Sequence, residues 1–65
     1  MTQEIRDIAV ELGKQAFRNR LENKPTQDTN LNELIKPIRR VSEWMKVCNA
    51  WVYGWMVESA SGAEA

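Results

Sequence analysis

Apolar residues recur at intervals of three and four between positions 31 and 55 of this 65-residue chain. That spacing is typical of an α-helix with one continuous apolar face. Eight residues form this face, which we call the seam: Leu31, Leu34, Ile38, Val41, Met45, Cys48, Val52 and Trp55. Trp44 and Trp51 widen it. We therefore predict a long helix over about residues 31–58, whose seam must be covered by the rest of the chain or by a partner.

A shallower apolar face precedes the seam. Its members lie at the same helical spacing: Ile5, Ile8, Ala9, Leu12 and Ala16. They predict a first helix over about residues 3–22. The connector at 23–29 has no apolar residue, and Pro25 prevents the first helix from continuing through it. The pattern thus predicts an all-α fold, a two-helix hairpin in which the start of the first helix lies near the end of the second. Because so short a chain buries little apolar surface, we expect this hairpin to form a homodimer or to bind a protein partner.

Pro37 interrupts the second helix, because a proline inside a helix removes a backbone hydrogen bond. The seam runs through it unbroken, which favours a kink. Proline is well tolerated at the first position of a helix, which favours a break, with a short helix at 31–35 and a main helix that starts near Pro37. Both alternatives remain open, and we favour the break.

The start of the second helix has three candidate caps. Asn30 is favoured because Glu33, three residues later, is placed to complete a capping box. Asp28 and Thr29 are the alternatives. Small residues follow Glu58 without an anchor, so we expect a frayed tail over 59–65. Residues 1–65 should form a single small helical domain.

Composition excludes most catalytic chemistry. The chain has no histidine and one cysteine, so it can assemble neither a Ser/His or Cys/His nucleophile nor a zinc site. We expect no enzyme, no cofactor, no metal and no small-molecule substrate. The single cysteine and the absence of a signal peptide predict a cytoplasmic protein. The longest apolar run is too short for a membrane span.

The net charge is zero, but the basic residues are unevenly distributed. Seven of them fall between positions 14 and 40: Lys14, Arg18, Arg20, Lys24, Lys36, Arg39 and Arg40. In a hairpin they would gather around the bend. That end of the molecule is therefore a candidate site for RNA phosphates or for an acidic protein partner.

The seam carries the second candidate site. Six residues form either core or an interface with a second copy or another protein: Trp44, Met45, Cys48, Trp51, Val52 and Trp55. Gly13 and Gly54 lie inside the predicted helices, where glycine costs about 1 kcal/mol relative to alanine. Close packing of another helix is the usual compensation, so we expect helix close-packing at both glycines.

Two motifs resemble a known family. The motifs are Ala9-x-x-x-Gly13-x-x-Ala16, followed by a basic segment and Pro25, and Trp51-x-x-Gly54-Trp55. This pairing is similar to the ribosome modulation factor family of small bacterial and phage proteins. The resemblance implies a compact two-helix fold and, in the best-known member, binding to ribosomal RNA.

These observations lead to two functional hypotheses. The first is a small non-enzymatic bacterial or phage regulatory protein that binds a macromolecule, with ribosome or RNA contacts through the basic bend. The alternative is an inhibitor or adaptor, such as a phage protein acting on a host protein, that docks its Trp/Met seam on a protein partner. A purely structural third possibility is a homodimer that consumes the whole seam.

Overall fold

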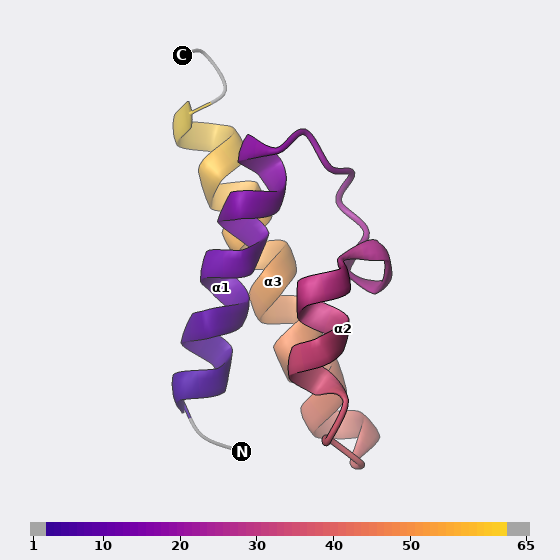
Figure 1. Cartoon of the computed structure of the whole chain (residues 1–65). Coiled ribbons are helices and arrows are strands. Elements are labelled where there is room, and N and C mark those ends of the chain that lie inside the picture. Colours follow the sequence, from indigo (N-terminus) through magenta and orange to yellow (C-terminus); the bar gives the residue numbers. More distant parts are fainter. Residues whose placement is uncertain (1–2, 63–65) are drawn as a thin grey trace.

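The computed structural model describes residues 3–62, and over that range the chain forms helices without a strand (Figure 1). Helix α1 spans Gln3–Arg18, α2 spans Thr29–Ile35 and α3 spans Val41–Gly62, with one 3₁₀ turn over Pro25–Gln27. The all-α prediction is confirmed. The chain divides the predicted second helix at residues 36–40, around Pro37, so a break and not a kink separates α2 from α3.

Helices α1 and α3 run parallel. The ribbons of both rise from the same end of the molecule in Figure 1, and α2 descends between them in chain order. Ile5 and Glu43, near the two starts, line one hollow, while Arg18 hydrogen-bonds Glu58 near the two ends. The predicted antiparallel hairpin is therefore corrected, because the separate helix α2 adds a second reversal of the chain.

The end of α1 is set by a left-handed residue. Arg20 has a φ of 63°, and its N–H donates to the carbonyl oxygen of Phe17 at 2.9 Å. The N–H of Leu21 donates to the carbonyl of Ala16, also at 2.9 Å. These two bonds form a Schellman motif, which closes a helix by satisfying its last carbonyls. The helix consequently stops at Arg18, four residues before the predicted boundary near residue 22.

Asp28 caps α2, not Asn30. One carboxylate oxygen of Asp28 accepts a hydrogen bond from the Asn30 N–H at 2.9 Å, which satisfies a free donor of the first turn. Glu33 is not the reciprocal partner in a capping box, and its carboxylate lies 3.8 Å from Lys36 Nζ. Asp28 was one of the alternatives, and its second carboxylate contact, described below, explains why it is preferred.

Helix α3 is displaced toward the C-terminus relative to the prediction. It begins at Val41, with the Arg40 carbonyl accepting from the Trp44 N–H at 2.9 Å, and not near Pro37. It continues to Gly62, so residues 59–62 of the expected frayed tail are helical. Residues 63–65 of that tail lie outside the described part of the chain.

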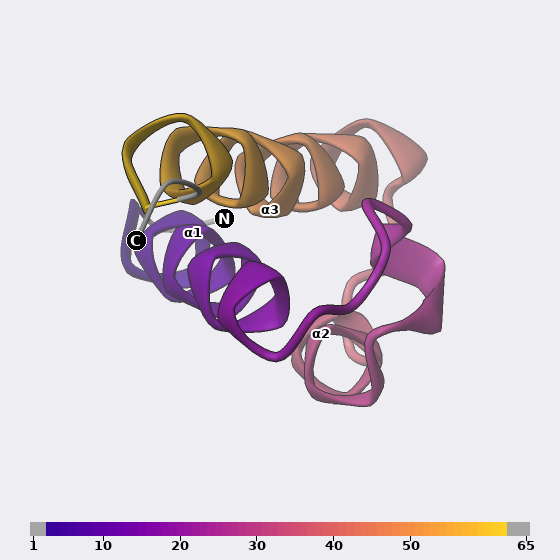
Figure 2. The same ribbon diagram turned by 90° about the horizontal axis from the view of Figure 1, so that it is seen from above.

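The core lies between the three helices. Figure 2 shows α1 and α3 side by side, with α2 against one side of the pair. Seven apolar residues are buried there: Ala9, Ala16, Leu31, Ile35, Val47, Cys48 and Trp51. The α1 contribution is two alanines, so the helices approach closely and α2 supplies the larger aliphatic side chains.

Gly13 and Gly54 lie where α1 and α3 are closest. A β-carbon at Gly13 would overlap the carbonyl oxygen of Trp51 and lie 2.9 Å from the amide nitrogen of Trp55. A β-carbon at Gly54 would overlap the carbonyl oxygen of Val10 and lie 2.8 Å from its carbon. In each case the neighbour is backbone, which no side-chain rotation can move aside. The absence of a side chain is what permits this approach.

Candidate functional site

The structure does not bring the seven predicted basic residues together. Lys14 and Arg18 lie toward the end of α1, and Arg20 and Lys24 follow in the connector. The other three, Lys36, Arg39 and Arg40, lie between α2 and α3, at the opposite end of the molecule (Figure 1). The parallel arrangement of α1 and α3 causes this separation, because the chain returns along α2 before α3 begins.

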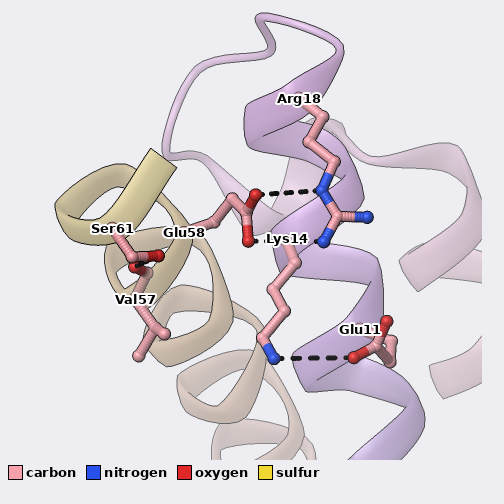
Figure 3. Close-up of polar contacts among 6 residues, drawn as sticks. All are labelled: Glu11, Lys14, Arg18, Val57, Glu58 and Ser61. Atoms are coloured by element: carbon pink, nitrogen blue, oxygen red, sulfur yellow. Dashed lines mark hydrogen bonds and ion pairs between the residues drawn. The ribbon is translucent and has the colours of Figure 1, made fainter. Parts of the chain in front are cut away.

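Four of the seven cations have carboxylate partners. The Arg18 guanidinium donates to both carboxylate oxygens of Glu58, at 3.0 and 3.3 Å, and thereby joins α1 to α3 (Figure 3). The other three ion pairs are local: Lys14–Glu11 at 3.6 Å, Lys24–Glu22 at 3.5 Å and Lys36–Glu33 at 3.8 Å. Within residues 3–62, Arg20, Arg39 and Arg40 make no ion pair.

The ion pair between Arg18 and Glu58 stabilises the charged form of each side chain. The hydrogen bond and charge of Arg18 hold the pKa of the Glu58 carboxyl below its ordinary value. The same hydrogen bond raises the pKa of Arg18. Figure 3 shows the pair near the C-terminal ends of α1 and α3, where it links the two helices across the surface.

Trp51 and Asp28 form a buried polar contact between α3 and the connector. Trp51 is fully buried, and its indole Nε1–H donates to the second carboxylate oxygen of Asp28 at 2.7 Å. Asp28 is itself only 6% exposed, and its two oxygens are used by Trp51 and by the α2 cap. A buried carboxylate is tolerated only when hydrogen-bonded, so this contact fixes the connector against α3.

The other tryptophans are half-buried. Trp55 packs edge-on against Phe17, with ring centroids 5.2 Å apart, and its Nε1–H donates to the Leu21 carbonyl at 3.0 Å. Trp44 is partly buried and packs against the core residues. Cys48 is buried, and that burial raises the pKa of its thiol. Five of the six members of the candidate interface, all except Met45, therefore belong to the chain's own packing.

Part of the seam remains uncovered. Val41, Met45 and Met56 are exposed at 69%, 52% and 57%, and Val52 between them is half-buried. Their spacing of four, seven and four places them on one face of α3. We call these four residues the α3 strip. The seam predicted from the sequence does not include Met56. Met56 follows Val52 by four residues, and this helical spacing could have identified it as a member of the same face.

Two of the hollows in the described part of the chain lie beside α3. A groove of about 770 Å³ between α1 and α3 includes Arg6, Val10, Lys46 and Tyr53 in its lining. A smaller hollow of about 400 Å³ lies at the start of α3 and is lined by Ile5, Pro37, Ile38, Arg39, Arg40 and Glu43. Sequence reasoning missed both, since each combines residues from two distant segments.

No group of three metal-ligating side chains occurs within residues 3–62. None of the helices described there has the length and apolar character needed to cross a membrane. No family model matches the chain, and no curated protein or solved structure matches it. Inference about function therefore depends on the surface of the molecule itself.

Proposed function

We propose that this protein is a small non-enzymatic regulator of the protein-binding type, an inhibitor or adaptor that inserts its α3 strip into an apolar groove of another protein. The observation that supports the proposal is the exposure of Val41, Met45 and Met56 along one face of a single helix. Three large apolar side chains in line differ from the scattered exposed residues of an ordinary surface.

The strip has the form of a helical recognition element. Val41 and Met56 are separated by four turns, or about 22 Å along the helix axis. Helix-in-groove recognition uses apolar anchors repeated at helical spacing on one face. Methionine is unbranched and flexible, so two of the four anchors can adapt to the shape of a partner. None of the four carries a charge that would have to be desolvated.

The size of the strip favours a grooved partner over a second copy of the chain. A standard interface buries about 800 Å² on each side, and four side chains on one convex helix supply much less. A second copy presents the same convex helix, so the pair would bury little more than the strips themselves. A groove also covers the flanks of α3. We therefore propose a different protein as the main occupant, with homodimerisation weak and concentration-dependent.

The test is affinity capture from a bacterial lysate, followed by titration of each captured protein after purification. Met45→Glu places a charge within the α3 strip and should abolish capture, because the charge must be desolvated in an apolar groove. Lys46→Glu is the matched control: it changes the neighbouring exposed residue, off the strip, and should capture like the wild type. Circular dichroism establishes that both variants are folded.

Two further arms separate the competing hypotheses. Nuclease treatment and high salt should leave capture intact, because apolar docking does not depend on phosphates, whereas ribosomal or other RNA contacts would weaken steeply with salt. Sedimentation at increasing concentration measures self-association. The proposal fails if Met45→Glu captures the same proteins as the wild type, if nuclease removes them, or if the strip is consumed in a tight homodimer.

A further inference from the structure

The hollow at the start of α3 is lined by apolar and by basic residues. Ile5 of α1 and Pro37 and Ile38 of the α2–α3 connection supply its apolar walls. Arg39 and Arg40 are exposed and form its cationic side. We call it the Pro37 hollow. Its volume of about 400 Å³ is within the range of small ligand pockets and admits one or two large side chains.

The charges of the hollow are not balanced by other residues of the described range, 3–62. Arg39 and Arg40 have no ion pair within residues 3–62. Glu43 also lines the hollow, but it already has an interaction partner. The lining therefore contains one carboxylate and two guanidinium groups, which leaves it net positive. Guanidinium groups pair well with carboxylates, often in bidentate geometry.

The Pro37 hollow lies at the end of α3 where the α3 strip begins, although no residue of the strip lines it. Val41, the first residue of the strip, follows directly on Arg40. A partner that contacts both the strip and the hollow would meet the hollow only at the Val41 end of the strip. The hollow is therefore placed to read one end of the partner, and its charge distinguishes that end from the other, which the uncharged strip cannot do.

We propose that the Pro37 hollow binds a bulky apolar side chain from an acidic segment of the partner protein, with Arg39 and Arg40 pairing with the flanking carboxylates. This inference rests on the proposed docking of the α3 strip and adds the chemistry and polarity of the partner. The occupant is a peptide segment and not a nucleic acid, because the apolar walls of Ile5, Pro37 and Ile38 offer nothing to a phosphate backbone.

The experiment uses the full chain and a short fluorescent peptide with glutamates on both sides of one phenylalanine. Binding is measured by fluorescence anisotropy, and contact residues are identified by amide NMR. Two matched peptides replace the phenylalanine by alanine, or the glutamates by glutamine. Each should bind about ten-fold more weakly, and the affinity of the parent peptide should fall with salt. The amide signals of Ile5 and Ile38 should shift on binding.

The decisive variant is Arg39→Glu with Arg40→Glu, which should weaken the parent peptide by about ten-fold or more. Arg6→Glu with Lys46→Glu makes the same change in net charge at exposed positions away from the hollow and should leave the affinity almost unchanged. If both double variants lost affinity for the peptide equally, net charge alone would explain the loss and the proposal would be overturned. Equal binding of the glutamine peptide, or competition by a single-stranded RNA, would also overturn it.

The two proposals fail separately. If Met45→Glu abolishes capture of the partner while the peptide does not bind, the α3 strip stands and the assignment of the hollow falls. If the peptide binds through Arg39 and Arg40 while Met45→Glu captures the partner normally, the docking strip falls and the hollow alone is supported.

Discussion

Replacing Gly54 by alanine adds one methyl group at the closest approach of α1 and α3. In an exposed helix that change is stabilising by about 1 kcal/mol, because alanine has the higher helix propensity. Here the new β-carbon would overlap the carbonyl oxygen of Val10 and lie 2.8 Å from the carbonyl carbon. The obstacle is backbone, so the helices must separate, and the packing between them is lost along with the overlap.

The expected magnitude follows from these opposing terms. Overpacking of a well-packed site costs about 1–3 kcal/mol, and more where a backbone must move. After subtracting the propensity gain, we expect Gly54→Ala to lower the free energy of unfolding by roughly 1–2 kcal/mol. For a domain of this size each kcal/mol corresponds to about 4–8 °C in Tm. Thermal unfolding followed by circular dichroism measures the change.

Two further variants sharpen the test. Asn49→Ala, on the exposed side of α3, makes a helix-favouring change without the overlap and should raise the stability by a few tenths of a kcal/mol. Gly13→Ala should destabilise like Gly54→Ala. The double glycine variant should lose less than the sum, because one separation of the helices relieves both overlaps. An unchanged or raised Tm for Gly54→Ala would refute the close packing of α1 and α3.

Three other predictions concern stability and are measured by urea unfolding. Arg20→Gly should stabilise the protein by up to about 1 kcal/mol, because a left-handed conformation is strained for residues other than glycine. Asp28→Ala should cost about 2–4 kcal/mol, since it removes the α2 cap and leaves the Trp51 indole unpaired, whereas Asp28→Asn keeps acceptor oxygen at the cap and should cost less. Glu58→Gln should be less stable than the wild type at neutral pH. Because the pKa of Glu58 is lowered on folding, that difference should disappear as the pH falls through its folded value, and a pH-independent difference would contradict the ion-pair account.

The residues of the seam show what the helical spacing of apolar residues predicts and what it does not. Their spacing identifies helical segments and the buried side of each, and Leu31, Cys48 and Trp51 are indeed buried. The same spacing marked Met45 and Val41, which are exposed. A period specifies which residues share a face, but not how much of that face the other helices of a small chain can cover.

The direction of the helices is a property of the whole fold. The sequence indicated a connector at 23–29 and a break at Pro37, yet it could not show that Thr29–Ile35 packs as an independent helix. Once that helix carries the chain back, α1 and α3 become parallel, and the basic residues on either side of it separate to opposite ends. The prediction of a basic site at the bend depended on an antiparallel arrangement of the two long helices, whereas α1 and α3 are parallel.

The other features of this protein either follow from the sequence alone or depend on tertiary contacts. The amino-acid sequence alone determined the helical class, an interruption of the second helix near Pro37, the lack of histidine-based chemistry and the need for a close helix neighbour at Gly13 and Gly54, because each follows from backbone geometry or residue type. Only the tertiary structure decided among the three caps, since the Trp51 indole reaches Asp28 and neither of its rivals. Only it revealed the α3 strip and the Pro37 hollow, because exposure is a relation between segments distant in the chain.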